Sequence, residues 1–351
     1  MTNRRELLKS ALGAAGGAAL AAPAASASKP AHGATWRRGP EGRRLADLGN
    51  GTYLNPILSG DYADPTVLRD GDTFYMTHSS YDAVPGIVIW KSHDLVNWAP
   101  VAPALFKAIG SVWAMDLIKH DGRFYIYIPA TPRGVQTIMV IHADHIEGPW
   151  SEPVDLHIPR IDPGHVVGED GKRYLFVSGG GRVRLTDDGL ATDGPLVEGA
   201  YELWNYPADW VVEMYAPEGP KLLRRDGWFY LVAAVGGTAG PPTSHMVVVS
   251  RSRSVNGPWE QCPHNPIVHT KSAAEPWWSR PCDARRGHGR RLVARLSRLR
   301  ERLSHARAAG APGTREMDCR RLAPGNRRRP VGTAAQGRVV APGRAAPHAV
   351  G

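Results

Sequence analysis

The stretch Asp226-Gly227-Trp228-Phe229-Tyr230-Leu231-Val232 decides the fold, because it reads as a tight turn followed by a strand and recurs along the chain. Three earlier segments, which begin at Asp70, Asp121 and Asp170, also have Asp-Gly followed within three residues by an aromatic and then apolar residues. Asp-Gly between short apolar runs is a strong hairpin signal, since glycine adopts the positive φ that a type I′ turn requires. The four copies start 51, 49 and 56 residues apart. A hairpin that recurs about every 50 residues is typical of a β-propeller, with one copy in each blade.

Four copies of the repeat predict four blades within residues 50–280, and a fifth blade is expected near residues 285–330. The composition changes before that blade. Residues 281–351 contain 17 Arg, no Lys and 4 acidic residues, whereas residues 1–280 contain 26 Lys and Arg against 29 Asp and Glu, and all 27 aromatic residues. We therefore predict an all-β fold of the five-bladed β-propeller type whose fifth blade is missing or scrambled. The Arg-rich tail over 281–351 is predicted to be disordered, or to form a short helix around residues 291–308.

Residues 1–27 have the features of an export signal. Arg4 and Arg5 precede an apolar Ala/Gly/Leu run over residues 11–22, and Ala25-Ser26-Ala27 offers a small-x-small cleavage site. The run is too short and too rich in Gly and Ala for a membrane anchor, so we predict twin-arginine-type export to a secreted or periplasmic destination. The alternative is a disordered Ala-rich leader. Residues 28–49 are predicted to link this segment to a propeller domain over residues 50–280.

Three acidic residues that precede three of the hairpins are candidates for catalysis: Asp64, Asp116 and Glu218. The innermost strands of a propeller all start at one end of its central channel, so residues that open these strands meet at the same mouth. Carboxylates that converge there suit general acid–base cleavage of a glycosidic bond. Glu218 also lies between Pro217 and Pro220 in an aromatic-flanked loop, which suits an acid with a raised pKa. The alternative for each residue taken singly is a turn carboxylate that caps nearby amides.

The motifs around these carboxylates resemble those of glycoside hydrolase family 43. They are Asn55-Pro56-Ile57-Leu58 followed by Ala63-Asp64-Pro65, then Trp113-Ala114-Met115-Asp116, then Ala216-Pro217-Glu218-Gly219-Pro220. The resemblance covers about residues 50–280, and Met115 stands where the family more often has proline. It implies a five-bladed propeller with β-xylosidase or α-L-arabinofuranosidase activity, which inverts configuration in a single displacement.

Transferred by position, the resemblance implies that Asp64 is the general base and Glu218 the general acid. It makes Asp116 a third carboxylate that orients and tunes the acid. Trp113 and Trp210 are candidates for stacking on sugar faces, with packing inside the blades as the alternative. The implied substrates are plant cell-wall oligosaccharides or polysaccharides. No cofactor is required, and no membrane partner is expected.

The resemblance ends after Arg280. Relatives continue with a Gly-His pair, whose His often binds a calcium ion or water in the channel, and later with a Gly-Arg pair whose Arg often holds substrate. Here His288 follows Gly287 in different surroundings, and the three cysteines lack the spacing of a zinc site, so we assign no metal ligand. Codons for residues 280–287 could, shifted by one base, encode Gly-His-Ala-Thr-Leu-Val-Glu, so we hypothesise a reading-frame change near Arg280.

Two other functions compete with hydrolysis. A propeller with an impaired site would bind carbohydrate without cleaving it, and turnover of a glycoside separates this alternative from the enzyme. Arg clusters such as those of the tail neutralise phosphates. The tail nevertheless has no aromatics for base stacking, and export argues against such a partner. We therefore predict no nucleic-acid partner.

Overall fold

The computed structural model of this 351-residue chain describes residues 38–39, 44–54, 56–241, 243–270 and 336–338. The predicted export signal, the expected fifth blade and most of the predicted tail lie outside these residues. The described elements are strands, apart from two short 3-10 helices, η2 (Pro132–Gly134) and η3 (Ser178–Gly180). Within this described part, no helix has the length and apolar character needed to span a membrane.

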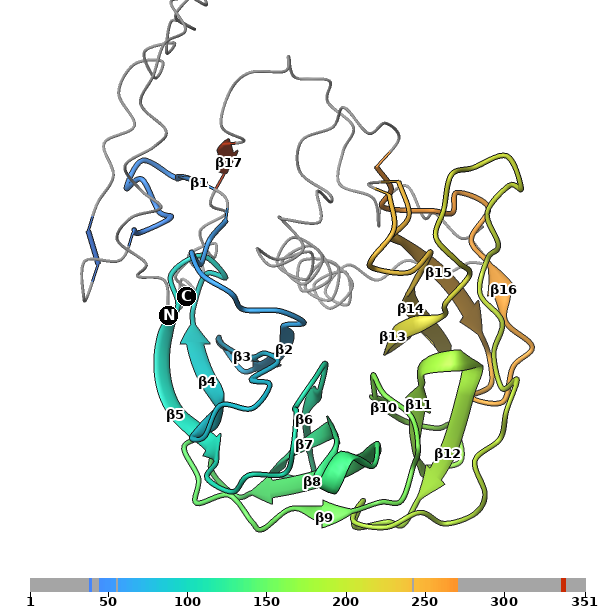
Figure 1. Ribbon diagram of the computed structural model, residues 1–351, viewed down its shortest axis with the longest axis horizontal. Coiled ribbons are helices and arrows are strands. Elements are labelled where there is room, and N and C mark those ends of the chain that lie inside the picture. The colour runs from blue at the N-terminus through green and yellow to red at the C-terminus, as the bar shows by residue number, and fades with distance from the viewer. Residues whose placement is uncertain (1–37, 40–43, 55, 242, 271–335, 339–351) are drawn as a thin grey trace, which may run out of the picture. The chain divides into compact units, whose positions relative to one another are not determined.

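Four antiparallel sheets follow one another along the chain, and each is one blade (Figure 1). Blade 1 consists of β2 (Thr66–Asp70), β3 (Thr73–Thr77), β4 (Gly86–Ser92) and β5 (Ala99–Leu105). Blade 2 consists of β6 (Asp116–His120), β7 (Arg123–Ala130), β8 (Thr137–Ala143) and β9 (Val154–Asp155). Blade 3 consists of β10 (Gly164–Val167), β11 (Arg173–Val177) and β12 (Gly181–Leu185). Blade 4 consists of β13 (Glu218–Arg225), β14 (Trp228–Val235), β15 (Met246–Ser252) and β16 (Glu260–Gln261).

The first strand of each blade lies nearest the common centre, and the later strands follow outward in chain order (Figure 1). Among these inner strands, β2 contacts β6, β6 contacts β10, and β10 contacts β13. A separate short ribbon pairs β1 (Thr52–Leu54) with β17 (Gln336–Arg338), the latter from within the predicted tail. The prediction of an all-β propeller fold is confirmed for the four described blades.

The repeated Asp-Gly pairs lie at the connections between the first and second strands, and in blades 2 and 4 they form the two-residue turn itself. At Asp121 and Gly122 the φ angles are 47° and 82°, and at Asp226 and Gly227 they are 50° and 72°. Two successive positive φ values are those of a type I′ turn, which matches the twist of the strands it joins. A Cβ added to Gly122 would meet nothing within 4 Å. Glycine is therefore needed here for its backbone angle and not for space.

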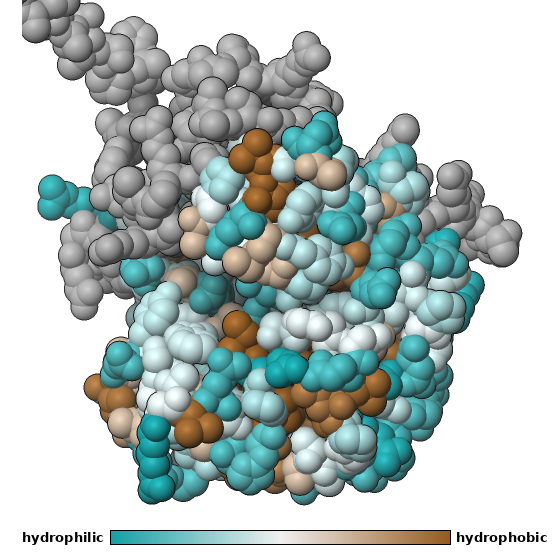
Figure 2. Space-filling model, turned by 45° about the vertical axis from the view of Figure 1, so that its right-hand side comes forward, coloured by the Kyte–Doolittle hydropathy of each residue, from teal (hydrophilic) through white to brown (hydrophobic). Residues whose placement is uncertain are grey.

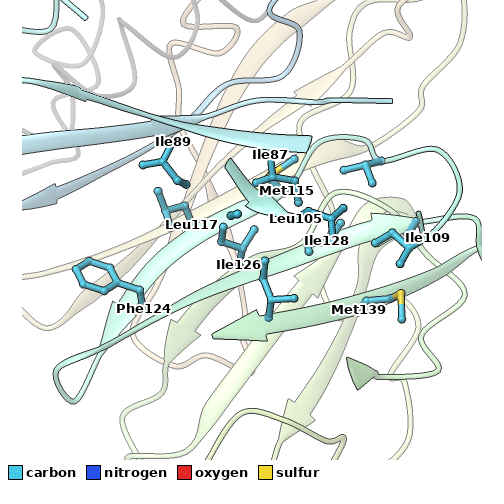
Figure 3. Close-up of a cluster of buried hydrophobic side chains, with 14 of the residues drawn as sticks. Ile87, Ile89, Leu105, Ile109, Met115, Leu117, Phe124, Ile126, Ile128 and Met139 are labelled. Carbon is cyan, nitrogen blue, oxygen red and sulfur yellow. The ribbon is translucent and has the colours of Figure 1, made fainter. Parts of the chain in front are cut away.

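Apolar side chains interlock between neighbouring blades and form the core. Between blades 1 and 2, Ile87 and Ile89 of β4 lie in one cluster with residues of β6 and β7, as Figure 3 shows. In β7, Phe124, Ile126 and Ile128 face this cluster, whereas Tyr125 and Tyr127 face a second cluster shared with blade 3. Since a blade covers each face, the β7 residues after Arg123 are all buried. Full burial of each isoleucine stabilises the fold by roughly 1.5–3 kcal/mol.

Few large apolar side chains of the described residues are exposed. The face in Figure 2 is mostly hydrophilic or intermediate, with apolar residues exposed in small groups. Exposed large apolar side chains include Tyr81, Phe106, Val135 and Val211. Each lies in a connection at the end of its blade where the inner strands begin. Exposed apolar side chains therefore occur around the same end that carries the predicted catalytic residues.

Candidate active site

Four acidic residues open the four inner strands. Asp116 is the first residue of β6 and Glu218 the first of β13, while Asp64 and Asp162 each lie two residues before β2 and β10. Since these strands run in the same sense around the centre and contact one another in order, their first residues meet at one end. The three acids predicted from the sequence are thus brought to the same end of the blades, and a fourth joins them.

Asp64 lies in an enclosed but solvent-accessible position. Its backbone has a φ of 50°, and its Oδ2 accepts a hydrogen bond of 2.6 Å from Ser79 Oγ. Ser79 N also donates to Ala63 O at 3.0 Å, so the connection that follows β3 holds the loop that carries Asp64. Burial raises the pKa of Asp64, the Ser79 hydrogen bond opposes that rise, and the charge of Asp61 adds to it. The carboxylate is therefore fixed in direction and still open to water, as a base that activates water must be.

Glu218 has the properties of a general acid. Its side chain is 22% exposed. Burial, and then the charges of Asp162, Asp64 and Glu213, raise the pKa of Glu218 to about 8. Its Oε1 is buried without a hydrogen-bond partner among the described residues, and lies 3.4 Å from His245 Nδ1. Glu218 is therefore protonated at neutral pH, with a proton available for a bound group.

Asp162 is the residue that sequence reasoning missed. It is 8% exposed with a φ of 59°, and its Oδ2 accepts a hydrogen bond of 2.9 Å from Gly219 N, the residue next to Glu218. Burial raises the pKa of Asp162 to about 6, with the Gly219 hydrogen bond opposing and the charge of Asp64 adding to the rise. Asp162-Pro163 precedes the third hairpin as Asp64-Pro65 precedes the first. A search for one strand-opening acid in every repeat would have found it.

Asp116 has a different environment from the one expected of a residue that tunes Glu218. It is 3% exposed and forms an ion pair of 3.0 Å with Lys221 Nζ. Its Oδ2 accepts a hydrogen bond of 2.8 Å from His165 N, and Thr66 Oγ1 lies 3.4 Å from its Oδ1. The charges that act on Glu218 come from other carboxylates, Asp162 first. The contacts of Asp116 thus join it to a lysine and to neighbouring blades.

The two tryptophans expected to stack on sugars lie in unlike surroundings. Trp113 is half-buried just before β6, where its Nε1 donates to Ser111 Oγ at 3.0 Å and its N to Pro129 O at 3.1 Å. Trp210 stacks on His269 with ring centroids 4.4 Å apart and meets Trp204 edge-on at 5.9 Å. One face of the Trp210 ring is therefore already covered, and packing against blade 4 explains its position. Trp113 remains the better candidate for a sugar face.

No three His, Cys, Asp or Glu side chains in the described part of the chain are grouped so as to hold a metal ion. The segment after Arg280, where the family resemblance would place a channel histidine, lies outside that part. The described residues therefore do not supply a site that fits a channel calcium ion.

The comparison with known proteins agrees with this geometry. The sequence profile of glycosyl hydrolases family 43 matches residues 53–289. The chain belongs to this family. A xylan 1,3-beta-xylosidase from a Vibrio species is 34% identical over an alignment that covers 63% of this chain. A non-reducing end alpha-L-arabinofuranosidase from Bacteroides ovatus is 30% identical, again over 63% of this chain.

The solved structures lead to the same family. The crystal structure of the family 43 protein BlXynB from Bacillus licheniformis matches with a TM-score of 0.57 and 32% identity, over 64% of this chain and 46% of that one. The alignments with the Vibrio and Bacteroides relatives cover 44% and 42% of those proteins. The chain therefore spans less than half the length of these three relatives.

Proposed function

We propose that this chain is an exported glycoside hydrolase that cleaves xylose- or arabinose-containing glycosides by single-displacement inversion. One observation carries the proposal: an acid whose pKa is about 8, Glu218, and a water-accessible carboxylate, Asp64, open inner strands at the same end of the blades. Glu218 is protonated at neutral pH, whereas the hydrogen bond from Ser79 opposes the rise that burial causes in the pKa of Asp64. Such a pair provides an acid and a base at once.

The reaction follows from these two states. Asp64 takes a proton from a water molecule as its oxygen attacks the anomeric carbon from one face. Glu218 gives its proton to the departing glycosidic oxygen as the bond between that oxygen and the anomeric carbon breaks. An inverting pair stands roughly 6.5–9.5 Å apart, which leaves room for the water. The products are a sugar of inverted anomeric configuration and a neutral alcohol.

Asp162 is the carboxylate that best fits the task of tuning the acid. Its negative charge is the first of the neighbouring charges that raise the pKa of Glu218. Its hydrogen bond to Gly219 N also fixes the backbone beside the acid. We assign the tuning role to Asp162 in place of Asp116, whose oxygens are bound by Lys221 and His165 N.

The substrate class is supported by the relatives, whose names refer to xylose and arabinose. Plant cell-wall oligosaccharides and polysaccharides contain both sugars. The half-buried ring of Trp113 and the exposed apolar side chains around the same end of the blades suit the apolar faces of sugar rings. A secreted or periplasmic location would give such an enzyme access to these polymers.

The full-length chain tests the proposal when it is incubated with xylobiose, 4-nitrophenyl β-D-xyloside and 4-nitrophenyl α-L-arabinofuranoside. We expect release of pentose, with proton NMR showing the inverted anomer as the first product. Retention of configuration would contradict the assignment of Asp64 as a base that activates water. Binding of xylo-oligosaccharides by calorimetry without any product would select the alternative, a carbohydrate-binding propeller with an impaired site.

A further inference from the structure

Lys221 pairs with one of the four strand-opening acids and acts electrostatically on two others, and it has no role in the reaction described above. It follows Glu218 by three residues in β13. Its Nζ donates to Asp116 Oδ1 at 3.0 Å, to Met115 O at 3.1 Å and to Pro163 O at 2.7 Å. An ammonium group has three protons, and each has an acceptor here. Lys221 is therefore fixed in place from two other blades.

The ion pair between Lys221 and Asp116 joins all four described blades. Lys221 belongs to blade 4 and Asp116 to blade 2. Asp116 also accepts a hydrogen bond from His165 N of blade 3, and Thr66 Oγ1 of blade 1 lies within hydrogen-bond distance of its Oδ1. The pair is largely buried, with side-chain exposures of 27% for Lys221 and 4% for Asp116. When one partner of a buried pair is removed, the charge of the other is left without compensation.

The neighbours of this ion pair are the residues proposed to act in hydrolysis. Pro163 follows Asp162, so the hydrogen bond from Lys221 holds the segment that carries the tuning carboxylate. Burial is the main cause that raises the pKa values of Asp64 and Asp162, and the charge of Lys221 opposes the rise for both. Without Lys221, the buried carboxylate of Asp116 would have no cation to compensate it at the end of the blades where Asp64, Asp162 and Glu218 lie.

The other charged and titratable groups that act on Asp64, or on which Asp64 acts, come from its own loop and from three other segments. Asp61 lies in its own loop, and His78 and Tyr81 lie in the connection between β3 and β4. Asp162 precedes β10 and Glu218 opens β13. Besides Lys221, His78 is the group here whose charge lowers the pKa of Asp64.

We propose that Lys221 is a positioning residue for the hydrolysis: its ammonium group joins Asp116 to the Asp162–Pro163 segment and balances the charge of Asp116 beside the reacting carboxylates. The inference rests on the proposed function. It predicts that the pKa values of Asp64 and Asp162 respond to the net charge of the Lys221–Asp116 pair, and not to the charge of Lys221 alone.

Three variants separate charge balance from packing. Lys221→Met removes the cation and leaves Asp116 charged. The double variant Asp116→Asn/Lys221→Met removes both charges. Lys119→Met is the matched control, because Lys119 lies in the same strand as Asp116 and its 2.7 Å ion pair with Asp70 joins blades 1 and 2 at the other end of that strand.

The first readout is the pH dependence of kcat/KM on 4-nitrophenyl xyloside or arabinofuranoside. In Lys221→Met we expect the acidic limb to move to higher pH, with the ratio of activity at pH 5 to that at pH 7 falling roughly three- to ten-fold. In the double variant we expect the acidic limb of the pH profile to return toward its wild-type position. In Lys119→Met we expect that limb to stay where it is in the wild type. An equal displacement in the single and double variants would overturn the proposal.

A second readout does not depend on activity. In Asp-labelled protein, carbon-13 NMR follows the titration of the Asp64 carboxyl group, assigned by its loss in Asp64→Asn. We expect its midpoint to rise in Lys221→Met and to return in the double variant; an unchanged midpoint in folded Lys221→Met would contradict the proposal. If Lys221→Met does not fold, the folded double variant is tested in the same way. An Asp64 midpoint equal to that of the wild type would then support the proposal, and a displaced midpoint would contradict it. If the wild type cleaves no glycoside, the proposed function fails while this titration still tests Lys221.

Discussion

Glu218 and Asp162 show how one hydrogen bond couples two carboxyl groups without direct contact. Asp162 accepts from the backbone N of Gly219, so its charge lies beside the acid in a fixed direction. Asp64 could be predicted from the sequence as a member of the site because a strand-opening acid in repeat register is a local signal. The environment of Asp116 could not be predicted from the sequence, because its pairing with Lys221 depends on the packing of separate blades.

The variant Glu218→Gln is expected to lower hydrolysis of xylobiose about 10²–10⁴-fold, because the leaving alcohol then departs without a proton. The loss on 4-nitrophenyl xyloside should be smaller, since nitrophenolate needs little protonation. Steady-state kinetics on both substrates measure the difference. Glu152→Gln, which changes an exposed glutamate paired with Lys107, is the control and should match the wild type. Equal losses on the two substrates would argue against Glu218 as the general acid.

The variant Asp162→Asn tests the tuning role. The negative charge of Asp162 raises the pKa of Glu218, so its removal should lower that pKa and let Glu218 lose its proton at lower pH. The alkaline limb of kcat/KM is then expected to move to lower pH, as a pH–rate profile will show. In Asp116→Asn the alkaline limb should move less. A larger movement there than in Asp162→Asn would return the tuning role to Asp116.

The hairpins are the elements that the sequence predicted best, and for a physical reason. An Asp-Gly turn is specified by two adjacent residues, so its signal survives without knowledge of the rest of the fold. Trp210 shows the opposite case. Its stacking on His269 joins residues 59 positions apart in the chain, and nothing local distinguishes a tryptophan that packs from one that binds sugar.

Gly122→Ala is expected to destabilise blade 2 by about 1–2 kcal/mol, because the φ of 82° is costly for any residue with a Cβ. Space is not the cause, as a Cβ there meets nothing within 4 Å. Gly122→Asn should cost less although asparagine is larger, since asparagine tolerates positive φ. Urea unfolding of both variants measures the difference. Alanine no worse than asparagine would indicate that the turn relaxes to another type.

At the scale of the whole molecule, the raised pKa values of buried acids make stability depend on pH. Those of Asp162 and Glu218, about 6 and about 8, lie above the values of roughly 3.9 and 4.3 expected in the unfolded chain. Both groups therefore favour the folded state fully below about pH 4, and this contribution is lost as the pH rises through about 6 and 8.

We expect the melting temperature of Glu218→Gln to rise relative to that of the wild type as the pH increases from 6 to 9. The reason is that glutamine does not ionise. Melting followed by circular dichroism at several pH values measures this gain. Glu152→Gln controls for the general effect of one charge fewer. A difference from the wild type that stays constant with pH would mean that Glu218 has an ordinary pKa.

Each described blade is built from strands that are consecutive in the chain, and the last of them, β16, ends at Gln261. The partner strands of a sheet are thus close neighbours in sequence, which shortens the loops that must close during folding. Each sheet can then form as soon as its own segment has been synthesised, and docking between sheets comes later. A change of reading frame after Arg280 would accordingly leave the hydrogen-bond ladders of these four sheets encoded in full.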